Sequence, residues 1–104
     1  MNATEQATVQ IPVEFLEDPE INSSTLRMWA ILAMRADEDD RITITLDQIA
    51  EVATFMSQRQ ALVQVKAMET IGIVDVERGV SRRFPNTYIV RRTRRHSAPS
   101  SGKR

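Results

Sequence analysis

Apolar positions recur at helical spacing in three segments of the chain. Residues 26–34 (LRMWAILAM) contain seven consecutive apolar residues from Met28, and a helix that is apolar on nearly every side must be buried on more than one face. Residues 46–53 and 57–72 each place a single apolar stripe at intervals of three and four residues. In the last segment the stripe is formed by Ala61, Val65 and Met68. The pattern therefore predicts three helices.

The second and third helices carry clear start signals. Thr45-x-x-Gln48 and Ser57-x-x-Gln60 are capping boxes, in which a hydroxyl and a glutamine side chain each satisfy a backbone N–H group at the helix start. Gly72 is a natural C-cap for the third helix. Two capping boxes this close together indicate a short helix, a turn and then a longer helix.

Three shorter segments have the alternation and β-branched composition of strands. Residues 41–44 (RITI) lie before the first capping box, and residues 73–78 and 86–90 flank a loop at residues 79–85. We expect the last two strands to pair as a hairpin.

The segment before the first helix is less regular. Residues 9–16 (VQIPVEFL) are expected to form an extended or turn segment, because Pro12 limits the strand pairing that it can join. Asp18-Pro19 should break the chain, and Ser23 and Ser24 are the expected N-caps of the first helix.

The two ends of the chain are polar. Residues 1–8 are expected to be flexible, and residues 93–104 (TRRHSAPSSGKR) form a basic, serine-rich tail that cannot bury enough apolar surface to fold alone. Residues 9–92 would then form one domain, as expected for a chain of 104 residues.

The order of helix, strand, helix, turn, helix and hairpin resembles the winged helix-turn-helix family, an α+β fold, over residues 9–92. The resemblance is carried by TLDQIA, SQRQ, IGIV and the hairpin ending PNTYIV. That ending and the opening IPVEFLEDPEI are similar to winged helices of plasmid and phage replication proteins. Thr54-Phe55 replaces the usual glycine of the inter-helix turn, and the spacing is about one residue longer than in common versions. The resemblance implies a third helix in the DNA major groove and a hairpin loop, or wing, on the DNA backbone or in the minor groove.

The net charge of zero hides an uneven distribution. Residues 1–50 contain ten acids and three bases, a balance of −7, whereas residues 51–104 contain four acids and eleven bases, a balance of +7. Such asymmetry indicates a polyanionic partner for the basic half. The alternative is an acidic face and a basic face that dimerise head to tail.

The third helix should present a DNA-contacting face opposite its apolar stripe. At about 100° per residue this face carries Arg59, Val63, Lys66 and Thr70. Arginine, lysine and glutamine pair with guanine or adenine edges, and an apolar side chain meets the thymine methyl group. An ordinary solvated face is the alternative, but Glu69 is the only acid between Ser57 and Thr70. The predicted contact residues on this helix are Ser57, Gln58, Arg59, Gln60, Val63 and Lys66.

Arginines outside the third helix are further candidates. Arg82 and Arg83 lie at the expected tip of the wing, where the negative potential of a minor groove attracts arginine. Four more arginines within five residues would add salt-dependent affinity for DNA phosphates; they are Arg91, Arg92, Arg94 and Arg95. A solvated turn and a solubilising tail are the respective alternatives.

Catalytic and metal-binding signals are weak. The chain has no cysteine, and His96, its one histidine, lies in the expected tail. The acidic run at residues 37–40 lacks the alternation, glycine and distal glutamate of a calcium loop. We therefore expect no enzymatic activity, no metal, no cofactor and no small-molecule ligand.

No apolar run approaches the roughly 20 residues of a membrane span, and the N-terminus lacks a signal peptide. We therefore expect a soluble cytoplasmic protein that is nucleoid-associated when it is bound to DNA.

The leading hypothesis is a sequence-specific double-stranded DNA-binding protein. It would act as a transcriptional regulator or as an accessory factor in replication or excision of a mobile element. The alternative is a protein-interaction winged helix that docks onto a replication or segregation assembly. A homodimer is expected, because one domain can cover only one face of the apolar first helix and because two-fold pairing lengthens a DNA site.

Overall fold

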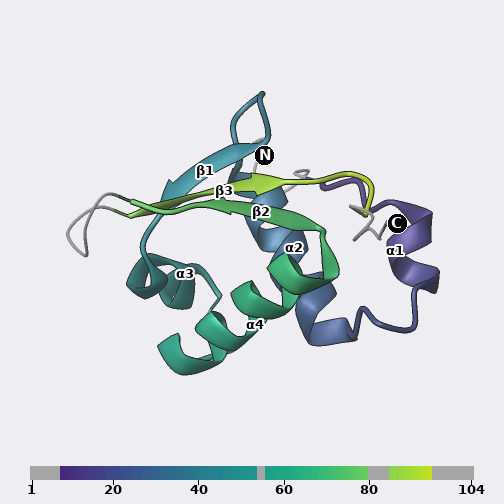
Figure 1. Cartoon of the computed structure of the whole chain (residues 1–104), viewed down its shortest axis with the longest axis horizontal. Helices are drawn as coiled ribbons and strands as arrows, with labels where there is room; N and C mark the ends of the chain where they lie inside the picture. Colours follow the sequence, from purple (N-terminus) through teal and green to yellow (C-terminus); the bar gives the residue numbers. More distant parts are fainter. Residues whose placement is uncertain (1–7, 54–55, 80–84, 95–104) are drawn as a thin grey trace, which may run out of the picture.

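The computed structural model describes residues 8–53, 56–79 and 85–94 of the chain (Figure 1). In chain order the elements are α1 (Val13–Glu17), α2 (Ser23–Arg35), β1 (Arg41–Ile44), α3 (Leu46–Val52), α4 (Gln58–Ile71), β2 (Val74–Glu77) and β3 (Asn86–Val90).

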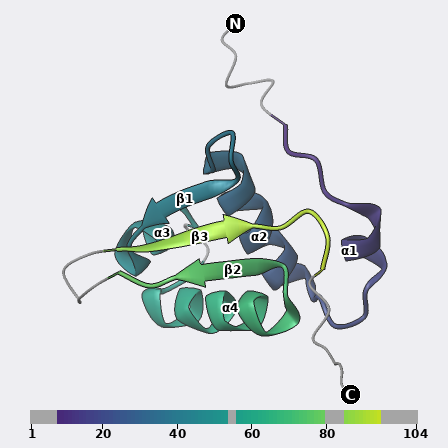
Figure 2. The same cartoon turned by 45° about the horizontal axis from the view of Figure 1, so that its top comes forward.

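The three strands form one antiparallel sheet in the order β1-β3-β2. Helices α2, α3 and α4 lie on one side of this sheet (Figures 1 and 2). The central strand turns Tyr88 and Val90 toward the helices, and both side chains are buried. Strands β2 and β3 form the predicted hairpin, which confirms the α+β fold class with three main helices, a short strand and a C-terminal hairpin, the arrangement of a winged helix.

Trp29 of α2 lies at the centre of the core and is fully buried. Its ring meets Phe15 of α1 edge to face, with centroids 5.3 Å apart and an interplanar angle of 86°, an arrangement that aromatic pairs favour. Its indole N–H donates to the carbonyl oxygen of Arg91 at 3.1 Å, so the polar atom of the ring is satisfied. One side chain thereby joins α2 to both ends of the described chain.

The helix boundaries follow the predicted signals in α3 and α4. Both capping boxes are formed in full: Thr45 with Gln48 begins α3, and Ser57 with Gln60 begins α4. Gly72 ends α4 at φ 94° in the left-handed region, where a residue without Cβ is favoured.

Two predictions for the N-terminal part were wrong. The N-cap of α2 is Asn22, whose side-chain oxygen accepts from the Thr25 backbone N–H at 2.9 Å, and Ser23 and Ser24 fall inside the first turn. Residues 9–16 were expected to be extended or turn, but the second half of this segment belongs to the short helix α1, Val13–Glu17. Phe15 explains this difference, because a helical turn directs its side chain into the core against Trp29.

Candidate nucleic-acid interface

Helix α4 packs against α2, α3 and β2 and leaves one face to solvent. Its inner stripe, Ala61, Val65 and Met68, is buried as predicted. The residues predicted on the opposite face are all exposed, namely Arg59, Val63, Lys66 and Thr70. The structure therefore presents a continuous outward strip along α4, and we call these four residues the α4 face.

The N-terminus of α4 is built by its capping box. The Ser57 Oγ accepts from the Gln60 backbone N–H at 3.2 Å, and the Gln60 Oε1 accepts from the Ser57 backbone N–H at 2.8 Å. The hydroxyl hydrogen of Ser57 and the side-chain NH₂ group of Gln60 are not used in this box and can donate to a ligand. Gln58 is exposed beside them.

A hydrogen bond that the sequence did not reveal fixes α4 against α2. The Thr25 Oγ1, which is buried, donates to the Gln64 Oε1 at 2.6 Å. The two residues are 39 positions apart in the chain, so neither local spacing nor periodicity could pair them. This contact adds a hydrogen bond between α2 and α4, and the buried stripe of α4 determines which face is exposed.

The cations of the α4 face have no internal partner among residues 8–53, 56–79 and 85–94. Neither Arg59 nor Lys66 forms an ion pair there, and both are exposed. Glu69, the one acid of α4, is instead engaged by Arg78 at 3.2 Å. The α4 face therefore carries positive charge that the rest of the described chain does not neutralise.

The arginines that follow β3 are arranged differently. Arg91 pairs with Asp75 at 3.2 Å, and Arg92 pairs with Asp40 at 2.8 Å while its guanidinium lies 5.4 Å from the centroid of the Trp29 ring. Their predicted role in DNA contact is not tested by these pairs. However, each charge is partly offset by a carboxylate of the same chain, which lowers its attraction for phosphate.

Arg94 joins the end of the described chain to two distant segments. Its guanidinium pairs with Asp18 at 2.9 Å and also with Glu20, both between α1 and α2. Its Nε donates to the Ile71 carbonyl oxygen at 2.8 Å, at the C-terminal end of α4, where a cation also suits the helix dipole. We call this set of contacts the Arg94 clasp.

The clasp shifts the ionisation of its members. The pKa of Asp18 lies below its ordinary value, chiefly because its carboxylate accepts from the Glu20 backbone N–H, and secondly because Arg94 donates to it and attracts it. The pKa of Arg94 is raised by its hydrogen bonds to Glu20 and Asp18. Both shifts favour the charged pair.

The lowered pKa of Asp18 predicts a loss of stability in acid. A carboxylate whose pKa is lower in the folded chain than in the unfolded chain stabilises the fold fully above its ordinary value of 3.8, and this stabilisation is lost as the pH falls through the lowered pKa. The free energy of unfolding of Asp18→Asn should therefore lie below that of the parent at neutral pH and converge on it in acid. Urea denaturation at a series of pH values measures this, and a difference that stays constant down to the most acidic sample would contradict it.

Three predicted contact residues, Arg82, Arg83 and Arg95, lie outside the described residues. The loop that carries Arg82 and Arg83 precedes β3, whereas Arg91, Arg92 and Arg94 follow it.

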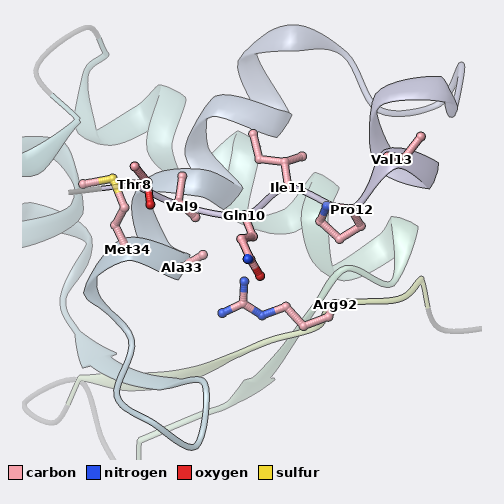
Figure 3. A pocket seen from close by; sticks show the side chains of 9 residues that line it. All are labelled: Thr8, Val9, Gln10, Ile11, Pro12, Val13, Ala33, Met34 and Arg92. Carbon is pink, nitrogen blue, oxygen red and sulfur yellow. The ribbon is translucent and has the colours of Figure 1, made fainter. Parts of the chain in front are cut away.

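An open groove lies between the N-terminal segment and the end of α2 (Figure 3). In Figure 3 the Gln10 side chain and the Arg92 guanidinium point toward one another across it. Its lining is Thr8, Val9, Gln10, Ile11, Pro12, Val13, Ala33, Met34 and Arg92.

Among the described residues there is no cluster of histidine or carboxylate side chains suited to a metal ion, and none of the helices is long and apolar enough to cross a membrane.

Comparison of the chain with protein-family models, curated proteins and solved structures found no match.

Proposed function

We propose that this chain is a sequence-specific double-stranded DNA-binding protein in which α4 enters the major groove. One observation carries the proposal: Arg59 and Lys66 stand on the exposed α4 face without an ion pair in the described structure, while Arg78, Arg91, Arg92 and Arg94 are paired with carboxylates. Unpaired cations on an exposed helix face are complementary to the phosphates and to the acceptor-rich guanine edge of a major groove.

The N-terminal end of α4 supports the same docking mode. Ser57, Gln58 and Gln60 offer side-chain donors beside Arg59, at the end of the helix where the dipole favours anions. Donors at a helix N-terminus position a protein on the DNA backbone, whereas side chains farther along the groove-facing strip read base edges. Arg82 and Arg83 in the loop between β2 and β3 are proposed to contact the backbone or minor groove.

The process served by DNA binding is proposed from the resemblance of the sequence. The sequence pattern is similar to the winged helices of plasmid and phage replication proteins and of small bacterial regulators. The role would be transcriptional regulation or an accessory function in replication or excision of a mobile element. The alternative, a winged helix that docks onto a protein assembly, is favoured by one observation: Leu62 and Val63 of α4 are exposed apolar side chains.

DNA binding across a salt series separates the two functions. We expect the full chain to retard random duplex DNA at about 50 mM salt and to lose affinity steeply as salt is raised, because neutralised phosphates release counterions. Selection from a random duplex pool should then yield a consensus. Failure to bind any duplex at the lowest salt would exclude the DNA-binding function and leave the protein-interaction module.

The C-terminal tail is predicted to contribute sequence-independent affinity. Deleting residues 95–104, which lie outside the described residues, removes Arg95, Lys103 and Arg104 but keeps Arg94 and its clasp. The slope of log affinity against log salt should become shallower by up to roughly 0.9 for each phosphate that these cations neutralise in the parent. Titration of specific and random duplexes tests this, and an unchanged slope would assign the tail no contact with DNA.

A homodimer is also proposed, but its structural basis is narrower than the sequence predicted. The expected surplus apolar face of α2 is largely covered within the chain, since Met28, Trp29, Leu32 and Ala33 are buried and Ala30 and Ile31 pack against the core. The remaining exposed side chains are Val13 and Leu16 of α1 and Met34 of α2, at 64%, 59% and 51% exposure. One recognition helix contacts only a short DNA site, and two-fold pairing of two chains would lengthen that site.

Sedimentation tests the dimer with a surface variant. The parent should sediment as a dimer on selected DNA at micromolar protein, and Val13→Ser/Leu16→Ser should sediment as a monomer. Both positions are exposed, so the variant should keep the circular dichroism spectrum of the parent. A monomeric parent on a non-palindromic site would refute the dimer.

A further inference from the structure

We infer that Val63 reads a thymine methyl group in the major groove, so that the bound sequence favours an A·T pair one or two steps from the base pair read by Arg59. This inference rests on the proposed function and names the base chemistry that the α4 face selects. Val63 lies at the centre of that face. Arg59 lies four residues before Val63, and Lys66 and Thr70 lie three and seven residues after it.

Nothing within the described chain accounts for a valine at this position. Val63 is 57% exposed, so it gains little from burial. A β-branched side chain also lowers helix propensity relative to alanine or to a long polar side chain. The neighbouring Leu62, 38% exposed, extends the apolar surface toward the border of the face.

The surroundings of Val63 specify the chemistry of its partner. A single exposed valine is ordinary on a protein surface, but Val63 stands between two cations that lack a carboxylate partner in the described ranges. An apolar protein surface would have to desolvate both cations in order to reach it. A major groove offers a partner to the cations and to the valine. Phosphates and guanine edges accept hydrogen bonds from the cations, and the C5-methyl group of thymine is the one apolar group on the floor of the groove.

The spacing along the helix places the thymine. One helical turn rises about 5.4 Å, and base pairs stack about 3.4 Å apart. A side chain one turn beyond Arg59 therefore reaches a base pair one or two steps from the pair that Arg59 reads. The expected consensus has a thymine, on either strand, at that separation from a guanine.

Removing the methyl group from DNA gives a direct test. Duplexes recovered from a random pool with the full chain are synthesised with deoxyuridine in place of each thymidine in turn, which deletes only the methyl group. At one position, affinity should fall about fourfold, equivalent to about 0.8 kcal/mol for one apolar carbon. The same substitution should have no effect on the Val63→Ala variant, because its partner side chain is absent.

A matched control keeps the result specific. Arg35→Ala removes an exposed side chain from the C-terminal end of α2, away from α4, and should retain the full sensitivity to deoxyuridine. If DNA is bound and a consensus is recovered, but no deoxyuridine position distinguishes the parent from Val63→Ala, the thymine contact is wrong while DNA binding stands. If no duplex is bound at low salt, both the inference and the proposed function fail.

Discussion

Replacing Trp29 with alanine should lower the free energy of unfolding by about 3–5 kcal/mol, the usual cost of truncating a buried large aromatic side chain. The side chain is fully buried, packs edge to face on Phe15 and donates to the Arg91 carbonyl oxygen. Truncation leaves a cavity and removes the hydrogen bond to the part-buried carbonyl oxygen of Arg91. Because a small domain is stable by only about 5–15 kcal/mol, the variant should be close to unfolding at room temperature.

Urea denaturation followed by far-ultraviolet circular dichroism measures this change, since Trp29 is the sole tryptophan and its fluorescence disappears with it. Trp29→Phe is the matched variant: it keeps an aromatic ring but removes the indole N–H, and should cost much less. Equal stability of Trp29→Ala and the parent would show that the core does not depend on the packing and hydrogen bond of Trp29.

The position of Trp29 explains why one substitution should affect the whole domain. Phe15 comes from α1, and the carbonyl of Arg91 and the guanidinium of Arg92 come from the segment after β3. The first and last described segments therefore pack on the same ring. The Arg94 clasp adds a second connection between these segments and joins them to the end of α4. Contacts near the two ends of the described chain thus support the helix that carries the candidate interface.

The elements that the sequence predicted well are those specified by neighbouring residues. The two capping boxes, Gly72 and the stripe Ala61, Val65 and Met68 act within one or two helical turns, so their spacing is sufficient to locate α3 and α4. The same holds for the exposed α4 face, which is the opposite side of a known stripe. Residues within one or two helical turns of one another are therefore sufficient to predict the α4 face.

The features that were missed depend on distant partners. The sequence predicted Ser23 or Ser24 as the N-cap of α2, whereas the cap is Asn22 and the helix that it begins buries Thr25 and Met28. Helix α1 has five residues, too few for periodicity to detect, and forms because Phe15 meets Trp29.

The arginines after β3 also have partners that are distant in the sequence. Arg91, Arg92 and Arg94 pair with acids that are 16, 52 and 76 positions away. Sequence alone presents them as a basic cluster available to DNA, because nothing local reveals their partners. The uneven charge of the two halves of the chain is partly offset by ion pairs between them, since Arg92 and Arg94 pair with acids of residues 1–50.

Substitution of the α4 cations should produce the largest decrease in specific DNA binding. Arg59→Ala and Lys66→Ala are each expected to weaken binding to the selected site by about 1–3 kcal/mol if they read base edges, that is, by roughly tenfold per 1.4 kcal/mol. Both side chains are exposed and form no ion pair in the described structure, so neither change should destabilise the fold. Titrations of selected and random duplexes at one salt concentration give the specificity ratio directly.

Arg35→Ala is the matched control, because Arg35 is also an exposed arginine without an ion pair among the described residues but lies at the C-terminal end of α2. It should leave the specificity ratio unchanged. A base-reading residue should lower affinity for the selected duplex and relax selection at one position, whereas a phosphate contact should weaken all duplexes about equally and reduce the salt slope by about 1. If Arg59→Ala and Lys66→Ala both bind the selected site as tightly as Arg35→Ala does, α4 is not the recognition helix, and the exposed Leu62 and Val63 would then support a protein partner.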